Sequence, residues 1–171
     1  MAYGRRYGMK VRIARFNNCC GPEGAWAGGR EKAPAAICRK VTEVQDGGTI
    51  EVWGNGTAIR SYTYVSDMVE GIYMLTQSDL EGPVNIGSPQ RVSVDQLVAI
   101  VAEVTAMKVN IKHVDGPVGV QARSFSSARI RSIRWRAETL LKEGIWLAYP
   151  WIEAQVKAQQ AREREKKMGN R

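Results

Sequence analysis

Hydrophobic positions along the chain recur with two periods, and each period predicts a different element. A period of two is typical of a strand, because successive side chains of an extended chain point to opposite faces. Alternating or short apolar segments predict strands over residues 9–16, 49–53, 59–65, 83–86 and 108–114. Apolar residues three and four positions apart predict helices instead. This spacing predicts helices over residues 31–44 and from near Ser66, Val94 and Arg136 onward.

Capping and breaking residues refine the ends of these elements. Residues 93–96 (Ser-Val-Asp-Gln) form a capping-box sequence, and Ser66 can cap the helix that follows it. The glycines and the proline within residues 17–29 predict a loop. Pro150 falls inside the apolar stripe of the last helix and is expected to kink or interrupt it. The residues of that stripe are Leu141, Ile145, Ala148 and Ile152.

The order of the elements and the composition bound the class of protein. Strands and helices alternate, which predicts an α/β fold with at least partly parallel strand pairing. At 171 residues with 44% hydrophobic positions, the chain can bury the core of one domain, or of one domain and a small annex. It contains no apolar run long enough for a membrane span and no secretory signal at residues 1–10, so we expect a cytoplasmic location and no membrane partner.

Positive charge is concentrated in three segments. Residues 1–16 and 121–136 each carry five Lys or Arg and no acidic residue, and residues 157–171 carry a net charge of +4. The whole chain has a net charge of +8, so the remainder is net acidic. Local clusters of this kind favour recognition of a compact anion such as a phosphate. Residues 157–171 are polar throughout and predict a basic, solvated helical tail.

Several common kinds of catalytic site are missing from the sequence. No G-x-G-x-x-G motif opens a helix after a strand, and neither a P-loop nor a G-x-S-x-G motif is present. His113 is the only histidine, and Cys19, Cys20 and Cys38 have neither metal-ligand nor disulfide-framework spacing. We therefore expect free, structural thiols and no metal. The residues by themselves indicate an α/β domain with anion-binding arginines.

Four segments resemble motifs of the extended short-chain dehydrogenase/reductases, in the order in which that family has them. They are RFNNCCGP (15–22), WAGGREKAPAAICRK (26–40), WGNGTAIRSYTY (53–64), and PVNIGS with GPVGVQAR (83–88 and 116–123). The second is similar to a stretch that is peculiar to the GDP-mannose 3,5-epimerase family. The resemblance covers about residues 7–156 and implies the C-terminal part of an extended Rossmann-type fold. That part comprises the last strands of the parallel sheet and a small substrate-binding α/β subdomain, which we assign to residues 1–156.

The resemblance also implies an activity. Enzymes of this NAD-dependent epimerase/dehydratase family are isomerases that bind GDP-mannose, oxidise its C4 transiently with NAD and invert C3 and C5 through an enolate. The glycine-rich NAD loop and the Tyr-x-x-x-Lys pair belong to the N-terminal half of the family, and alignment on Arg15 and Phe16 places them before Met1. Tyr3 is not that tyrosine, because Tyr7 stands where the lysine would be. The implied partners are GDP-mannose or a related nucleotide sugar, and an N-terminal NAD-binding half or a second copy in a homodimer.

Seven positions match functional residues of the family. Lys32 matches the lysine that acts as an acid/base at carbon, although the ordinary role of a lysine in a first helical turn is a solvated charge. Six more match the substrate contacts: Asn18, Glu31, Ala33, Lys40, Arg60 and Arg123. Of these, Arg60 and Arg123 match arginines that grip the diphosphate, a role that suits the two directed hydrogen bonds of a guanidinium. The ordinary alternative for either arginine is a surface ion pair.

The sequence departs from the family pattern near these positions, and two other functions stay open. Cys20 replaces a tyrosine, and Ala58 and Ile59 replace a glutamine and a threonine. The chain could instead be half of a nucleotide-sugar decarboxylase, dehydratase or C4 epimerase, but the match at Lys32 favours 3,5-epimerisation. A non-enzymatic basic protein that binds nucleic acid or an acidic partner is the remaining alternative. Nucleic acid is not expected, because aromatic residues are not interleaved with the basic segments.

Overall fold

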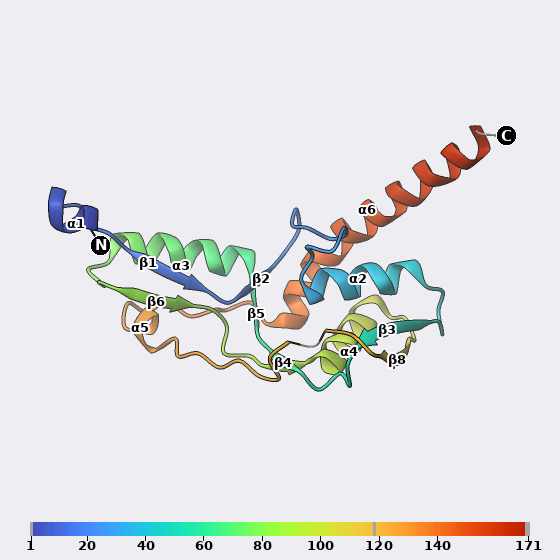
Figure 1. Cartoon of the computed structure of the whole chain (residues 1–171), viewed down its shortest axis with the longest axis horizontal. Coiled ribbons are helices and arrows are strands. Elements are labelled where there is room, and N and C mark those ends of the chain that lie inside the picture. Colours follow the sequence, from blue (N-terminus) through green and yellow to red (C-terminus); the bar gives the residue numbers. More distant parts are fainter. Residues whose placement is uncertain (1, 118, 170–171) are drawn as a thin grey trace.

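The computed structural model describes residues 2–117 and 119–169, which fold into two lobes that lie side by side (Figure 1). Its strands are β1 (Ile13–Phe16), β2 (Asn18–Cys20), β3 (Thr49–Trp53), β4 (Ile59–Arg60), β5 (Tyr62–Tyr64), β6 (Pro83–Ile86), β7 (Val92–Ser93) and β8 (Asn110–Val114). Its helices are α1 (Ala2–Tyr7), α2 (Ala33–Glu43), α3 (Val65–Gln77), α4 (Val94–Thr105), α5 (Ala128–Arg131) and α6 (Leu141–Gly169). The described residues contain no helix that is long and apolar enough to cross a membrane.

Strand pairing is mostly parallel, as the alternation of strands and helices predicted. The parallel pairs are β1 with β6, β2 with β5, and β3 with β8, whereas β4 and β7 are antiparallel. Both strands of a parallel pair run in the same direction, so each pair needs a long crossover connection. The crossovers carry the helices, and this places residues that are far apart in sequence at the same edge of a strand pair.

The N-terminal lobe consists of β1 and β6 with α3 and α5 packed against them (Figure 1). Its buried core is formed by Met68, Leu75, Val84, Ile86, Ile130 and Trp135. Gly71 allows α3 to approach this core closely, because a Cβ at that position would lie 2.7 Å from Cγ2 of Ile86 and 2.9 Å from Cε2 of Trp135. Such distances are shorter than ordinary van der Waals contact, so a side chain at position 71 would push the helix away from the sheet.

A buried carboxylate connects α3 to the segment that leads into α6. Asp67 is only 6% exposed. Its side chain accepts hydrogen bonds from the backbone N–H groups of Glu138 (3.1 Å) and Thr139 (2.9 Å) and from the Thr139 hydroxyl (3.0 Å). The indole N–H of Trp135 donates to the Asp67 carbonyl oxygen at 3.1 Å. These contacts satisfy polar groups that would otherwise be buried without partners.

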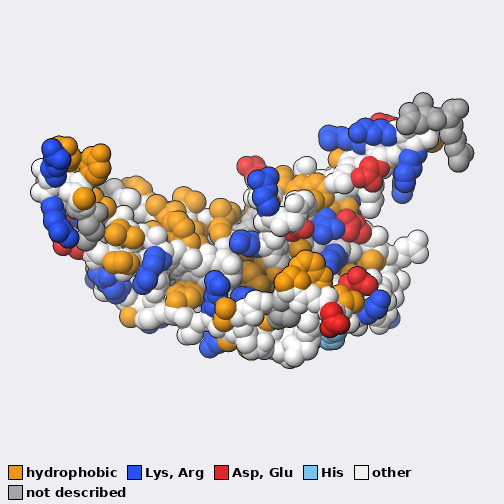
Figure 2. Space-filling view, in the orientation of Figure 1, with side chains coloured by type: hydrophobic (Ala, Val, Ile, Leu, Met, Phe, Trp, Pro, Cys, Tyr) orange, Lys and Arg blue, Asp and Glu red, His pale blue; other side chains and the backbone are white. Residues whose placement is uncertain are grey.

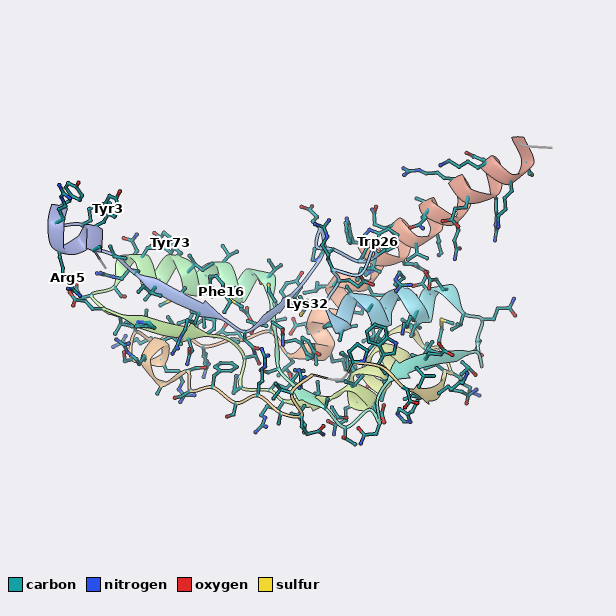
Figure 3. All side chains as sticks on the ribbon, in the orientation of Figure 1. Tyr3, Arg5, Phe16, Trp26, Lys32 and Tyr73 are labelled. Carbon is teal, nitrogen blue, oxygen red and sulfur yellow. The ribbon has the colours of Figure 1, made fainter. Side chains whose placement is uncertain are left out.

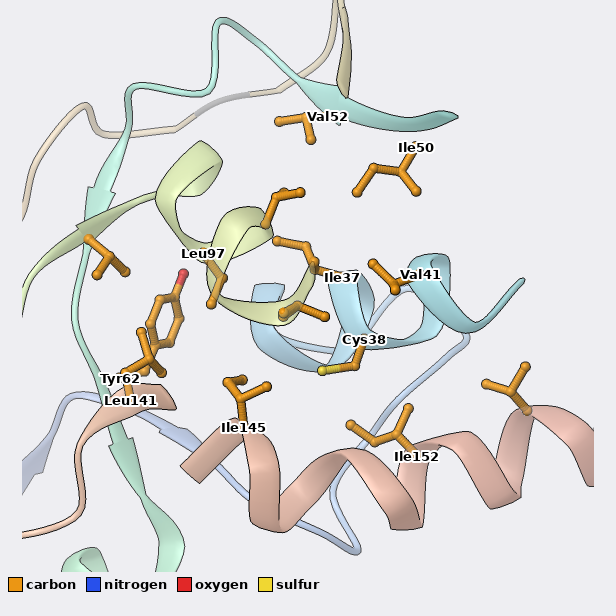
Figure 4. Close-up of a cluster of buried hydrophobic side chains, with 14 residues drawn as sticks. Ile37, Cys38, Val41, Ile50, Val52, Tyr62, Leu97, Leu141, Ile145 and Ile152 are labelled. Atoms are coloured by element: carbon orange, nitrogen blue, oxygen red, sulfur yellow. The ribbon is translucent and has the colours of Figure 1, made fainter. Parts of the chain in front are cut away.

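The C-terminal lobe packs α2, α4 and α6 together, with the β3–β8 pair on one side (Figure 4). The predicted stripe of α6 is confirmed, since each of its four residues is at most 4% exposed. The other residues of this core are Ile37, Cys38, Val41, Ile50, Val52, Tyr62, Val92, Leu97, Val98, Val101 and Val156. Complete burial of one such aliphatic side chain contributes about 1.5–3 kcal/mol, so this core is the main source of stability for the lobe.

Several predicted helix ends are corrected by the structure. The expected interruption of the last helix at Pro150 is wrong, because α6 continues through the proline, and the expected kink stays a prediction. The buried residues Ala148 and Ile152 hold both sides of the proline against the core, which offsets the lost N–H bond. The same helix begins at Leu141 rather than near Arg136, since the preceding backbone N–H groups bind Asp67.

The capping box of α4 is confirmed. The Ser93 hydroxyl accepts from the Gln96 N–H at 3.0 Å, and the Gln96 side chain accepts from the Ser93 N–H at 2.8 Å. The predicted cap of α3 at Ser66 is wrong, because Tyr64 is the N-cap residue. The helix predicted from Glu31 begins at Ala33, so Lys32 becomes the N-cap residue of α2.

The N-terminal strand is shorter than predicted. The alternating pattern covers residues 9–16, but only Ile13–Phe16 pair with a neighbour, since β6 is itself short. Residues 2–7 form α1, which the pattern did not predict, and the predicted loop over residues 17–29 contains β2. Gly21 follows β2 at a close approach, because a Cβ there would lie 2.6 Å from Cγ1 of Val65.

The end of α6 extends beyond the body of the protein (Figure 1). Residues 157–168 are helical and almost all exposed, because they follow Val156, which is buried in the core of the C-terminal lobe. The tail predicted for residues 157–171 also includes residues 170 and 171, which lie outside the described residues. The boundary between domain and tail stays a prediction.

Candidate substrate site

Three hollows contain the residues that the sequence singled out. The first, which we call the α2–β3 hollow, has a volume of about 380 Å³. Four predicted substrate residues line it: Glu31, Ala33, Lys40 and Arg60. Lys40 is held in place here by a hydrogen bond from its ammonium group to the carbonyl oxygen of Glu51 on β3. This hollow therefore joins the first two turns of α2 to the strands β3 and β4.

Aromatic residues that the sequence analysis did not single out also line the α2–β3 hollow. Trp53 is 59% exposed, and its ring offers an apolar surface at the end of β3. Tyr62 is buried, and burial raises the pKa of its phenol to about 12. Trp53 opens one of the motifs quoted above, and Tyr62 lies two residues after Arg60 in the same motif. Their position in this motif was the sequence signal that could have identified them as site residues.

Glu31 is a largely enclosed charged group of the α2–β3 hollow. Its side chain is 10% exposed and forms an ion pair with Arg39 at 3.3 Å. A hydrogen bond from its own backbone N–H lowers the pKa of Glu31; burial opposes this effect, whereas the Gly29 N–H and Arg39 lower the pKa further. Glu31 Oε2 and Arg39 Nε are buried without hydrogen-bond partners among the described residues. Both atoms belong to residues of one ion pair.

The lowered pKa of Glu31 predicts a loss of stability in acid. A carboxylate whose pKa is lower in the folded state contributes stability above its ordinary value of 4.5, and this contribution is lost as the pH falls through the folded-state pKa. We expect Glu31→Gln to flatten the fall in free energy of unfolding with decreasing pH below that value. Urea denaturation between neutral and acid pH measures the effect, with Glu81→Gln as a control for the loss of an exposed carboxylate. Parallel pH profiles for wild type and Glu31→Gln would contradict this prediction.

The second hollow, the arginine hollow, has a volume of about 420 Å³ and is lined by Asn18, Arg60 and Arg123, among others. Ile59 bridges Ala122, and its N–H donates to the Gln121 carbonyl oxygen at 2.8 Å. This pairing brings residues 121–123 alongside β4, so that Arg60 and Arg123 meet although 63 positions separate them in sequence. Arg60 also lines the α2–β3 hollow, and it therefore connects the two hollows.

Local hydrogen bonds fix two of the residues of the arginine hollow. Nη1 of Arg60 donates to the carbonyl oxygens of Ile59 (2.8 Å) and Gln121 (3.4 Å). Nδ2 of Asn18 donates to the carbonyl oxygen of Ser61 at 3.2 Å, which holds this side chain against the neighbouring strand segment. Arg123 is exposed. The motif that contains Arg123 includes Val118, which lies outside the described residues.

Lys32 lines a third hollow, of about 330 Å³, together with Cys19, Cys20 and Cys38. We call it the thiol hollow. Lys32 is exposed and lies where the two lobes meet (Figure 3). The structure thus separates Lys32 from the other predicted site residues, because the backbone at the N-terminus of α2 turns Glu31 and Ala33 toward one hollow and Lys32 toward another.

All three cysteines are free. Burial raises the pKa of Cys38, which is completely buried, to about 12. Burial likewise raises the pKa of Cys20 to about 12, and its thiol lies 3.6 Å from the carbonyl oxygen of Thr63. Cys19 is exposed. The thiols of Cys20 and Cys38 therefore stay protonated at neutral pH and act as packing groups.

The described residues do not fit the pyrophosphate of NAD. A cradle for this anion needs free N–H groups at a helix N-terminus that follows a glycine-rich turn. The N-termini of α3 and α4 follow Tyr64 and Ser93 without such a turn. At α2 the glycine pair is followed by the Glu31 carboxylate, and Pro34 removes one N–H group. We therefore assign no residue of this chain to NAD. No group of His, Cys, Asp or Glu side chains in the described ranges could hold a metal ion.

Parallel strand pairs whose crossover connections carry helices are the arrangement of a Rossmann-type α/β protein. A family model, the NAD-dependent epimerase/dehydratase family, matches residues 1–87. The chain belongs to this family. The assignment agrees with the resemblance that the motifs carry.

Curated relatives and a solved structure extend this comparison. The chain is 41% identical over 161 residues to GDP-mannose 3,5-epimerase from Arabidopsis thaliana, which covers 94% of the chain and 42% of that protein. It is 32% identical to UDP-glucuronic acid decarboxylase 6 from the same plant over 84% of the chain and 41% of the relative. The chain therefore spans less than half the length of these relatives.

A UDP-glucose 4-epimerase from Thermotoga maritima has the same fold. The TM-score is 0.80 at 21% sequence identity, and the match covers 91% of this chain and 50% of the solved one. That structure contains UDP-glucose. At this level of identity the comparison establishes the fold alone. It confirms the expectation of one part of a Rossmann-type epimerase fold.

Proposed function

We propose that this chain provides the nucleotide-sugar-binding part of a GDP-mannose 3,5-epimerase, which is an isomerase. The observation that carries the proposal is the meeting of Arg60 and Arg123 in one hollow that adjoins the α2–β3 hollow. The similarity to the Arabidopsis epimerase over 94% of the chain supports the choice of substrate. The proposed partners are GDP-mannose and the segment of the family fold that binds NAD.

Each part of the nucleotide sugar would bind at a different place in these hollows. The guanine base would lie in the α2–β3 hollow, where Trp53 and Tyr62 offer apolar ring surfaces. The diphosphate would lie at Arg60 and Arg123, since a guanidinium binds phosphate oxygens through two directed, charge-assisted hydrogen bonds. The sugar would extend toward the junction of the lobes, where Lys32 is exposed.

Lys32 is the proposed acid/base. Inversion at a sugar carbon requires the removal of a proton from one face and its return to the other. NAD, when bound by the family fold, supplies the transient oxidation at C4 that makes the neighbouring C–H groups acidic. Lys32 would then carry a proton to or from C3 and C5 on one face of the sugar, and an acid/base of the part of the family fold that this chain does not span would serve the opposite face. Asn18, Glu31, Ala33 and Lys40 would position the substrate.

Replacement of Arg123 tests the proposed diphosphate site. Arg123→Ala should weaken GDP binding by about 1.5–3 kcal/mol, because it removes hydrogen bonds between charged groups. This corresponds to a roughly ten- to hundredfold rise in Kd, which isothermal titration calorimetry of the purified chain can measure. Arg131→Ala on α5 is the matched control, since Arg131 is exposed and lines none of the three hollows. Equal Kd values for wild type and Arg123→Ala would remove Arg123 from the site.

A decarboxylase is the second candidate, because a UDP-glucuronic acid decarboxylase is 32% identical to the chain. That reaction breaks a C–C bond and needs no acid/base lysine at both C3 and C5. The role of Lys32 therefore separates the two candidates. We also propose a cytoplasmic location, which the three free cysteines support.

A further inference from the structure

The thiol hollow contains a carboxylate that the proposed function does not use. Glu23 lines this hollow together with Lys32, and both residues are exposed. Within residues 2–117 and 119–169, neither charged group forms a hydrogen bond or an ion pair, and the two do not pair with each other. The surface at the junction of the lobes carries acidic and basic side chains beside apolar ones (Figure 2). Both charged groups are therefore available to a ligand.

The other walls of the thiol hollow suit a sugar ring. Ligand pockets are typically lined by apolar groups, with a few polar groups that fix the orientation of the ligand. Besides the three thiols, the apolar residues that line this hollow are Pro22, Ala25, Pro34, Ala35, Val65, Ile145, Ala148 and Ile152. The C–H groups of a hexose can pack against these walls while its hydroxyl groups reach Glu23 and Lys32. Lys32 lines neither of the other hollows, so a sugar carbon that exchanges a proton with Lys32 lies here.

The backbone at Glu23 is in a conformation that costs free energy. Its φ of 62° lies in the left-handed region, which side chains other than glycine and asparagine rarely adopt. Pro22 and Glu23 form a turn, and Gly21 holds the start of this turn against Val65. Strain of this kind persists where the surrounding structure imposes it, and it is concentrated at binding and catalytic sites. The turn therefore holds Glu23 at the hollow at a cost in stability.

We propose that Glu23 is a positioning residue for the sugar and that its carboxylate accepts a hydrogen bond from the C6 hydroxyl of the hexose. C6 is attached to C5, one of the two carbons at which Lys32 would transfer a proton. The other hydroxyl that takes no part in the reaction is on C2, which is bonded directly to the diphosphate-bearing C1. Glu23 lines neither of the hollows that contain Arg60, so C6 rather than C2 lies within its reach. This inference rests on the proposed function, since it takes the sugar to lie at Lys32.

The charge of Glu23 implies a choice of substrate class. A carboxylate only accepts hydrogen bonds and a hydroxyl donates one, so the two form a charge-assisted hydrogen bond. A hexuronic acid carries a carboxylate at C6 in place of this hydroxyl, and like charges brought together at a binding site repel each other. Glu23 therefore selects a neutral hexose over a hexuronic acid.

Isothermal titration calorimetry of the purified 171-residue chain tests the proposal with GDP, GDP-mannose and GDP-mannuronic acid. Glu23→Ala should raise the Kd of GDP-mannose about tenfold to hundredfold, as for the loss of a hydrogen bond to a charged group, and should leave the Kd of GDP unchanged. Glu23→Gln removes the charge and keeps an acceptor, so it should lower the Kd of GDP-mannuronic acid by about tenfold or more. Glu81→Ala is the matched control, since Glu81 is exposed and lines none of the three hollows. Its three Kd values should equal those of wild type.

Glu23→Gly separates the proposed contact from a structural role. Glycine adopts the φ of residue 23 without steric cost, so the midpoint of thermal unfolding should equal or exceed that of wild type. The Kd of GDP-mannose should nevertheless rise as it does in Glu23→Ala. A lower midpoint with an unchanged Kd of GDP-mannose would make Glu23 a structural turn residue and would overturn the inference.

Two other results would overturn the inference. One is an equal Kd of GDP-mannose for wild type and Glu23→Ala, and the other is an equal Kd of GDP-mannuronic acid for wild type and Glu23→Gln. If the chain alone binds none of the three ligands, KM is measured on the complete fold, in which the portion of the Arabidopsis relative that the chain does not span precedes Ala2. Glu23→Ala should then raise the KM of GDP-mannose by the same factor, and an unchanged KM would overturn the inference.

GDP affinity separates this inference from the proposed function. GDP has no hexose, so its Kd reports on the arginines and not on Glu23. Wild-type GDP binding together with an unchanged Kd of GDP-mannose in Glu23→Ala removes Glu23 from the site and leaves the proposed nucleotide site in place. A Kd of GDP-mannose that rises in Glu23→Ala but not in Arg123→Ala supports Glu23 and contradicts the proposed diphosphate contact.

Discussion

Replacement of Lys32 by alanine should abolish exchange of solvent protons at C3 and C5 of GDP-mannose. A general acid/base typically contributes about 10²–10⁴-fold to a rate, so the loss should be plain. The measurement needs the complete fold, which is obtained when the portion of the Arabidopsis relative that the chain does not span precedes Ala2. Incorporation of deuterium from heavy water into the sugar, followed by NMR, reports the exchange at each carbon.

Three controls separate the loss of proton transfer from other effects of the substitution. Lys32→Arg keeps the positive charge but cannot give up a proton, so it should lose exchange as alanine does. Lys10→Ala removes a lysine of the N-terminal lobe that lines none of the hollows and should keep the wild-type rate. Calorimetric affinity for GDP should remain within about twofold in the Lys32 variants, because the proposed diphosphate contacts are elsewhere. Exchange that persists in Lys32→Ala would make Lys32 a solvated helix-cap lysine and would favour the decarboxylase candidate.

Replacement of Asp67 by alanine should destabilise the chain by about 2–3 kcal/mol, because it removes a buried acceptor of three hydrogen bonds and leaves two part-buried N–H groups and a hydroxyl without it. These donors belong to Glu138 and Thr139, which lead into α6. The loss would therefore reach both lobes. In a thermal unfolding experiment the midpoint should fall by about 5–10 °C, given the size of the chain.

Two further variants test the cause of this loss. Asp67→Asn retains one side-chain acceptor and should lose about half as much stability as Asp67→Ala. Asp95→Ala removes a carboxylate that pairs with His113 at the surface, at 3.0 Å, and should cost less than about 1 kcal/mol. If Asp67→Ala were no more destabilising than Asp95→Ala, the contacts of Asp67 would not be what connects α3 to α6.

Much of the fold could be predicted because its signals are local. The capping box of α4 depends on residues three positions apart, and the stripe of α6 depends on helical spacing. The parallel pairing followed from the alternation of strands and helices. The predictions failed where a residue that is distant in sequence determines the boundary or continuity of an element. The start of α6 depends on Asp67, more than 70 positions earlier, and α6 passes through Pro150 because the core holds both sides of it.

The candidate site, like the fold, could be predicted from the sequence only in part. The residue types and their order along the chain identified the arginines and Lys32 as candidates, and their roles stay predictions. The family model matches residues 1–87, which include the motifs of Lys32 and Arg60. The sequence did not indicate that Arg60 belongs to two hollows at once, or that Trp53 and Tyr62 complete one of them. Their arrangement depends on the pairing of residues 121–123 with β4, which no local pattern reports.

The sequence by itself determined the types of the main elements, the cap of α4, the buried stripe of α6 and the family to which the motifs belong. Only the tertiary structure decided that Arg60 and Arg123 share a hollow while Lys32 lies in another. The physical reason is the separation in sequence between the residues that make each contact. Periodicity and capping report contacts within a few residues, whereas strand register and helix packing join residues that are 60 or more positions apart.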